Sequence, residues 1–183
     1  MTGAIRTSCA LALLLTPTVL AFFSGGYFAG PRLVAGAAVW LLALVGFWVA
    51  SDPLPRQRSS WIALLGIFAL TALVGLSITW APLRSVAQSD FQRLLVYLGA
   101  FLAALTLLRG RTGLRFAELV LALGSLTVTV YALSARIFPG FVQETASASA
   151  AGRLEQPLTY WNASGMLACV GLILCLRIGA DST

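Results

Sequence analysis

The sequence predicts an all-α, polytopic transmembrane bundle of about six helices, and two observations support this fold class. Of the residues, 59% are hydrophobic and 10% are charged, and the mean hydropathy is +0.91. In soluble domains about a quarter of all residues are charged. The 183 residues also contain apolar runs of about 20 residues, the length that crosses roughly 30 Å of hydrocarbon as a helix. We expect one integral-membrane domain over residues 1–183.

The first three spans are apolar runs with interfacial residues at their ends. The first resembles a signal peptide in position, but five further spans follow it, so we expect it to be retained as a helix. The third has Trp61 and Trp80 at its two ends, where tryptophan is enriched at membrane surfaces. The predicted ranges of these spans are residues 9–29, 33–50 and 61–80.

The last three spans are separated by polar segments. Before the fourth, Ser89 and Gln92 match a capping box, so this helix is expected to begin there. The sixth is expected to begin at Pro157, an accepted first-turn position, because a start at Asn162 leaves too few residues before Ile178 to cross the membrane. The predicted ranges are residues 91–108, 116–138 and 158–178.

Arginine supplies all 12 basic residues, and the formal net charge is +6. The arginines are scattered through short loops instead of lining one solvated face, which favours membrane topology over nucleic-acid binding. Cytoplasmic loops are enriched in basic residues. An N-terminus on the inside places RQR (56–58) and RGRTGLR (109–115) in the cytoplasm and loop 139–157 outside.

Arg93 is the first candidate for an external ligand. It lies in the expected first turn of the fourth helix, where a cation opposes the helix dipole. Either an i,i+3 ion pair with Asp90 or an anionic ligand outside the membrane would account for it, and the sequence favours the ion pair somewhat.

The stretch GRLEQPLTYWNASG (152–165) contains the other candidates. With a helix start at Pro157, Asn162 would lie about 7 Å below the helix start and would need hydrogen-bond partners from a neighbouring helix or a ligand. Arg153 lies just above it, where a guanidinium can bind a phosphate while lipid chains lie along the helix. The alternative is a solvated arginine paired with Glu155. Tyr160 and Trp161 are expected to be interface anchors.

Other chemistry has little support in the sequence. The chain has three Cys and no His, and no spacing typical of a metal or redox site, so we expect no metal and no cofactor. Charges are missing from the middle of every predicted span, which argues against an ion-coupled transporter. Glu118 lies near a span end, three residues after Arg115, as in an i,i+3 pair.

RLEQPLTYWNASG before an apolar helix resembles the external helix entry of the O-antigen ligase and polymerase family. FSGGYF (23–28) and GLSITWAPLRSVAQSDFQRLLVYLGAF (75–101) also resemble members of this family, in the same order. The resemblance implies a metal-independent glycosyltransferase of the GT-C class in the bacterial cytoplasmic membrane. Such an enzyme moves glycan from an undecaprenyl diphosphate carrier at the outer face during cell-surface polysaccharide assembly. By resemblance, Arg153 corresponds to a diphosphate-binding arginine and Asn162 to the asparagine of the entry motif, with Arg93 a weaker match.

The sequence also departs from the family pattern. Family members usually have ten or more membrane helices and an acceptor-activating His on a later external loop, and this chain offers six spans and no His. We therefore expect an N-terminal portion of a longer family protein, a truncated gene or a fragment, and activity in transfer by this chain alone stays open. Two alternatives stay open: half of a transporter or flippase for a lipid-linked substrate, and a non-catalytic membrane protein.

Overall fold

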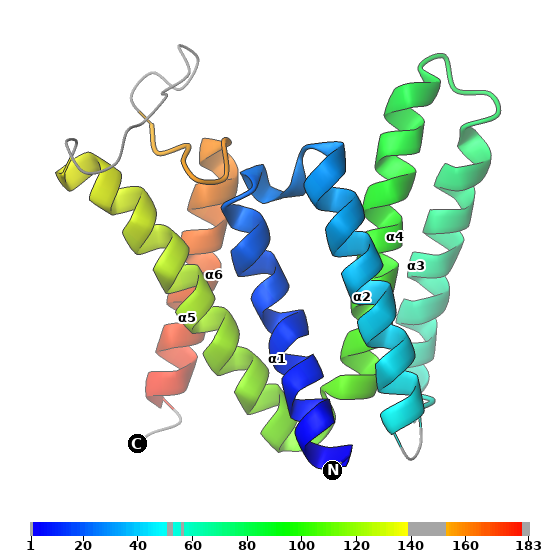
Figure 1. Cartoon of the computed structure of the whole chain (residues 1–183), viewed down its shortest axis with the longest axis horizontal. Helices are drawn as coiled ribbons and strands as arrows, with labels where there is room; N and C mark the ends of the chain where they lie inside the picture. The colour runs from blue at the N-terminus through cyan, green and yellow to red at the C-terminus, as the bar shows by residue number, and fades with distance from the viewer. Residues whose placement is uncertain (1, 51–52, 56, 139–152, 181–183) are drawn as a thin grey trace. The chain divides into compact units, whose positions relative to one another are not determined.

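The computed structural model describes residues 2–50, 53–55, 57–138 and 153–180. Within these ranges the chain forms a short 3-10 turn, η1 (Ser24–Gly26), and helices only, without strands (Figure 1). All six α-helices are long and apolar enough to cross a membrane, which confirms the all-α polytopic fold and identifies an integral membrane protein. The helices are α1 (Thr2–Ala21), α2 (Ala29–Val49), α3 (Arg58–Ser77), α4 (Arg84–Leu107), α5 (Gly110–Ile137) and α6 (Trp161–Ala180).

Five helices begin before the predicted apolar spans. The largest differences are at α1, which begins at Thr2, and at α4, which begins at Arg84. The expected capping box at Ser89 and Gln92 is wrong, because both residues lie inside α4 and its N-cap, Leu83, makes no side-chain cap bond. Polar residues do not break a helix, so the 24 residues of α4 extend about 36 Å, beyond the hydrocarbon thickness.

The first helix ends earlier than predicted. Its apolar run was expected to continue to residue 29, but α1 ends at Ala21. Three consecutive residues then adopt left-handed backbone conformations, with φ of 56° at Ser24, 63° at Gly25 and 75° at Gly26. A right-handed helix cannot pass through such residues, so FSGGYF forms the turn η1.

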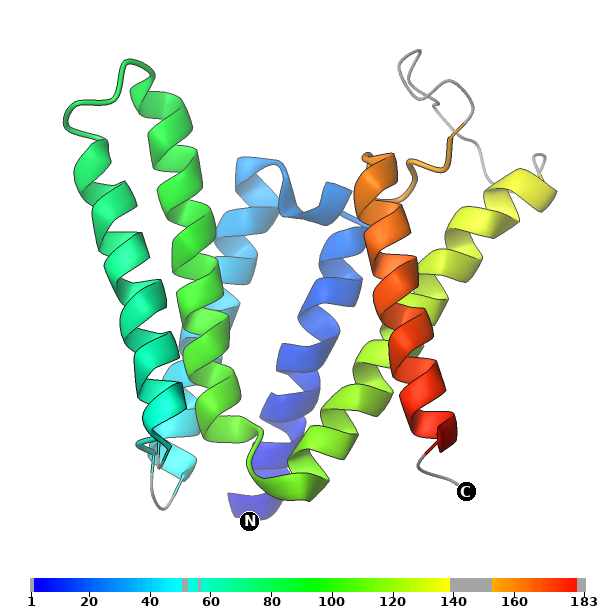
Figure 2. The same ribbon diagram turned by 180° about the vertical axis from the view of Figure 1, so that it is seen from behind.

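The chain divides into two compact units. The first contains residues Met1–Leu13 and Phe28–Gly113, and the second contains Leu14–Tyr27 and Leu114–Thr183. The single-domain expectation stays a prediction. In the first unit α4 packs against both α2 and α3. Both views of the ribbon show α4 beside these two helices (Figures 1 and 2).

Parallel packing of α2 and α4 forms the core of the first unit. At one end the Arg32 guanidinium donates to Gln92 Oε1 at 3.0 Å. Further along, the Trp40 indole N–H donates to a backbone carbonyl of α4 at 3.1 Å. At the other end Gly46 lies against Thr106. The residue numbers of these contacts increase together along α2 and α4, so the two helices run in the same direction.

The helices α5 and α6 pack antiparallel in the second unit. Glu118, near the start of α5, forms an ion pair with Arg177, near the end of α6, with 3.0 Å between Oε1 and Nη2. About two turns further along α5, Ser125 faces Gly171 of α6. A Cβ added at Gly171 would lie 2.9 Å from Ser125 Cβ. The close approach therefore depends on the missing side chain of Gly171. Small residues allow such approach between membrane helices.

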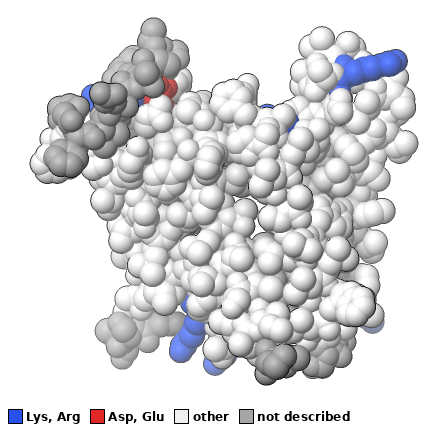
Figure 3. All heavy atoms as spheres, in the orientation of Figure 1, with Lys and Arg blue, Asp and Glu red and all other residues white. Residues whose placement is uncertain are grey.

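Most of the described charged side chains lie within two turns of a helix end or in connecting segments, whereas Arg93 and Glu118 lie in the third turns of α4 and α5. In the space-filling view the middle of the visible face is uncharged, and arginine and carboxylate atoms are near the ends of helices (Figure 3). Hydrocarbon does not solvate charge, so this distribution is the one that a membrane requires. The sidedness of the membrane and the predicted outer position of loop 139–157 stay predictions, and residues 139–152 lie outside the described residues.

We expect Gly46→Val to lower the free energy of unfolding by about 1–3 kcal/mol, because a well-packed contact is overfilled. A Cβ at Gly46 would lie 3.2 Å from Leu107 Cγ and would also clash with Thr106. Gly66→Val is the matched control, since a Cβ there meets nothing within 4 Å, and we expect a change within about 0.5 kcal/mol. Equilibrium unfolding in mixed detergent micelles measures both, and equal effects would contradict the α2–α4 packing.

Candidate functional site

The segment before α6 sets the position of the sequence-predicted site. The prediction that this helix begins at Pro157 is wrong, because α6 begins at Trp161. Thr159 has a φ of 61°, a left-handed conformation that a right-handed helix excludes. The length argument failed at the other end: α6 continues past Ile178 to Ala180, and its 20 residues span about 30 Å.

Asn162 therefore lies closer to the start of α6 than predicted. It is the second residue of α6 and its side chain is exposed, so the expected depth of about 7 Å is wrong. Its Nδ2 donates to the Tyr160 hydroxyl at 2.8 Å. This local bond provides the hydrogen-bond partner that was expected from a neighbouring helix or a ligand.

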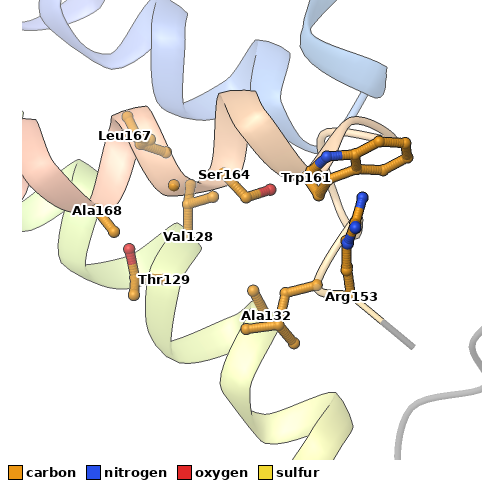
Figure 4. A pocket seen from close by; sticks show the side chains of 10 residues that line it. Val128, Thr129, Ala132, Arg153, Trp161, Ser164, Leu167 and Ala168 are labelled. Atoms are coloured by element: carbon orange, nitrogen blue, oxygen red, sulfur yellow. The ribbon is translucent and has the colours of Figure 1, made fainter. Parts of the chain in front are cut away.

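An apolar groove runs between α5 and α6 (Figure 4). Its volume is about 410 Å³. The Thr129 hydroxyl donates to Ser125 O at 2.8 Å, and the Ser164 hydroxyl donates to Tyr160 O at 3.4 Å, so both hydroxyl protons are used within their own segments. Asn162 does not line this groove, whose walls are formed by Val128, Thr129, Ala132, Arg153, Leu154, Trp161, Ser164, Gly165, Leu167 and Ala168.

Arg153 is the charged residue of the groove. Its guanidinium carbon lies 5.1 Å from the centroid of the Trp161 ring, within the range of a cation–π interaction. In the close-up, Arg153 extends toward Trp161 at one end of the groove, while Val128 and Thr129 lie further along α5 (Figure 4). Arg153 is exposed and Glu155 is buried. Among the described residues, the two form no ion pair with each other.

The Trp161 ring is the site residue that sequence reasoning missed. Trp161 was expected only to anchor the interface, and its stacking with Arg153 has no periodic signal. The two residues are joined by a non-helical segment that includes the left-handed Thr159. Because such a segment has no regular repeat, the spacing of eight residues does not predict the contact.

Arg93 belongs to the first unit. Its Nη1 lies 2.7 Å from Asp90 Oδ1, and both side chains are partly exposed. The i,i+3 ion pair is therefore confirmed. Because α4 begins at Arg84, the pair lies in the second and third helical turns and not in the first. A buried arginine that sequence reasoning did not single out, Arg32, lies on the neighbouring helix and contacts Gln92.

Comparison of the chain with protein-family models, curated proteins and solved structures found no match. The function of the α5–α6 groove is consequently argued from its chemistry. A guanidinium held beside an apolar groove can bind an anion that is attached to an apolar chain.

We expect Arg153 and Trp161 to be energetically coupled by about 0.5–1 kcal/mol, the range for an exposed cation–π pair. Arg153→Gln, Trp161→Leu and their combination form a double-mutant cycle, measured by equilibrium unfolding in mixed micelles. The control cycle pairs Trp161→Leu with Arg84→Gln, whose arginine is exposed and belongs to the first unit. Additive effects in the Arg153 cycle would show that the stacking does not persist in solution.

Proposed function

We propose that this chain binds the lipid carrier in a membrane glycosyltransferase of the O-antigen ligase type. The donor is a glycan linked to undecaprenyl diphosphate at the outer face of the bacterial cytoplasmic membrane. The observation that supports this proposal most is Arg153 at the rim of the apolar groove between α5 and α6. The groove and the cation match the two chemically different parts of such a carrier.

Arg153 provides the anion-binding half of the proposed site. A guanidinium presents paired N–H donors that match the oxygens of a phosphate, and its charge persists at all physiological pH values. The ring of Trp161 restricts where the guanidinium lies, so less rotamer freedom is lost when an anion binds. Within the described part of the chain, the guanidinium of Arg153 contacts the face of the Trp161 ring, and a cation–π contact of this kind does not require its N–H groups.

The groove provides the apolar half. Its small residues, Ala132, Gly165 and Ala168, leave space between two helices, and a polyisoprenoid chain can cover that space. Membrane lipid chains are equally apolar, so burial of the carrier tail alone gives little preference over the surrounding bilayer. Selection of the carrier is therefore assigned to the diphosphate and Arg153.

The same residue has a role in the proposed reaction. Glycosyl transfer forms a bond from the acceptor oxygen to the anomeric carbon and breaks the bond from that carbon to the diphosphate oxygen. Negative charge grows on the departing diphosphate, and a cation held beside it lowers the barrier. The sequence contains no His, so the acceptor-activating His implied by the resemblance has no counterpart in these 183 residues. We limit the proposal for this chain to donor binding and leaving-group stabilisation.

We expect Arg153→Ala to weaken binding of undecaprenyl diphosphate about 10- to 100-fold, the effect of losing one or more charge-assisted hydrogen bonds. Arg153→Lys should retain part of the affinity, since it keeps the charge but lacks the planar fork. The control is Arg84→Ala, which removes an exposed arginine of the first unit. Binding is measured by microscale thermophoresis in detergent, and equal losses for the two alanine variants would contradict the assignment.

We expect Gly165→Phe to separate tail binding from head binding. A Cβ at Gly165 meets nothing within 4 Å, so a phenyl ring there fills the groove without forcing the helices apart. Affinity for undecaprenyl diphosphate should fall by about two- to threefold, equivalent to about 0.4–0.7 kcal/mol, because a displaced tail finds a nearly equal apolar environment outside the groove, while affinity for inorganic pyrophosphate stays unchanged. Gly179→Phe is the control, on the same helix and outside the groove. An unchanged affinity for the lipid would show that its tail lies elsewhere.

A further inference from the structure

Two arginines converge on the C-terminal end of α4 in the first unit. Arg6 Nε, from the first turns of α1, donates to Leu107 O at 3.0 Å. Arg109 Nε, from the turn between α4 and α5, donates to Leu105 O at 3.1 Å. The acceptors are two residues apart, which is about 3 Å along a helix axis and about 200° around it. The two guanidinium groups therefore bind the same helix end from different sides, and we call them the α4 arginine cap.

Helix capping uses only part of their hydrogen-bonding capacity. The last carbonyls of a helix lack intrahelical partners and carry partial negative charge, which the two cations compensate. Each guanidinium has five N–H donors. Arg6 uses its Nε, and Arg109 uses its Nε together with one Nη2 bond to Leu54 O at 3.1 Å. Both side chains are half-exposed, so the remaining Nη groups can bind an external anion.

An apolar pocket adjoins Arg109 of the α4 arginine cap. It has a volume of about 200 Å³ and lies between α2, α3, α4 and residues 53–55. Arg109 donates to the carbonyls of two of its lining residues, Leu54 and Leu105, so the guanidinium lies at the rim. The pocket continues inward along α2 from Phe47 to Trp40, about 10 Å at 1.5 Å per residue.

The described residues at this end of the first unit are strongly basic. Arg58 begins α3 and Arg111 follows the start of α5, and both are exposed. Among the described residues of this unit, the single carboxylate is Asp90, which pairs with Arg93 toward the opposite end of α4. An excess of cations beside an apolar pocket at a helix end is complementary to a lipid with an anionic headgroup.

We propose that the α4 arginine cap binds the phosphate of an anionic membrane phospholipid, one acyl chain of which occupies the adjoining pocket. The lipid phosphate bridges the start of α1 and the end of α4, and the chain fills space between α2, α3 and α4. A soluble phosphate would use the cations and leave the pocket empty. This assignment is independent of carrier binding by Arg153, which lies in the other unit.

The test is lipid binding to the full chain in detergent, followed by native mass spectrometry. Dioleoylphosphatidylglycerol should bind more tightly than dioleoylphosphatidylcholine, by about fivefold for each contributing guanidinium, or about 25-fold for the pair. The comparison requires no substitution, so it holds whether or not variants fold. Equal affinity for the two lipids would overturn the proposal.

Matched double variants distinguish a specific lipid site from nonspecific electrostatic attraction of anionic lipids to the basic end of the unit. Arg6→Gln with Arg109→Gln removes two charges while an amide N–H stays available for the α4 carbonyls. Arg58→Gln with Arg111→Gln removes the same charge from exposed positions at the same end. The first pair should abolish the preference for phosphatidylglycerol, and the second should retain most of it. Equal losses would show diffuse electrostatic attraction and contradict a specific site.

A competition experiment distinguishes a phospholipid headgroup from a soluble phosphate as the bound anion. Inorganic phosphate and glycerol 3-phosphate carry the anion without an acyl chain, so neither should displace phosphatidylglycerol at equimolar concentration. Phosphatidylglycerol with brominated acyl chains should quench the fluorescence of Trp40, which lines the pocket. The measurement uses a variant with Trp48, Trp61, Trp80 and Trp161 replaced by Phe. Displacement by either soluble anion, or Trp40 quenching equal to that with brominated phosphatidylcholine, would overturn the proposal.

Discussion

Hydrocarbon offers no hydrogen-bond partner, and this constraint determines where the chain can carry out chemistry. Every backbone polar group within the membrane must be satisfied inside a helix, and charges belong at the helix ends. Hydroxyls within the spans obey the same constraint: Thr71 donates to Ile67 O at 2.7 Å, and Thr127 donates to Leu123 O at 2.8 Å. Polar groups that can meet an outside ligand are therefore concentrated at the ends of the helices, next to apolar space.

The two proposed sites use this arrangement differently. In the second unit Arg153 is positioned by the ring of Trp161, and we propose that its N–H groups bind a diphosphate. In the first unit Arg6 and Arg109 are positioned by the carbonyls of α4, so part of their hydrogen-bonding capacity supports the fold. Apolar grooves alone distinguish poorly between a carrier tail and bulk lipid. In both proposals the guanidinium groups supply the selectivity for a phosphate, and the adjoining apolar space holds the apolar chain.

The sequence predicted the six spans well, because total hydrophobicity over about 20 residues is enough to identify them. Helix ends were predicted poorly, since a helix can continue beyond the hydrocarbon, as α4 does back to Arg84. The Arg93–Asp90 pair was predictable because i,i+3 neighbours on a helix are set by local geometry. Asn162 was placed too deep because the left-handed conformation of Thr159 is not encoded by a periodic pattern. The contact between Arg153 and Trp161 depends on the same irregular segment and was missed for the same reason.

Photo-crosslinking tests most directly whether the α5–α6 groove binds a lipid carrier through Arg153. A polyisoprenoid diphosphate with a benzophenone in its tail is incubated with the chain in nanodiscs and irradiated, and labelled peptides are identified by mass spectrometry. The account predicts labels on groove residues such as Val128, Leu167 and Ala168. Excess unlabelled diphosphate carrier should suppress these labels, and they should be lost in Arg153→Ala. Labels confined to other helices, or groove labels of equal strength in Arg153→Ala, would contradict the account.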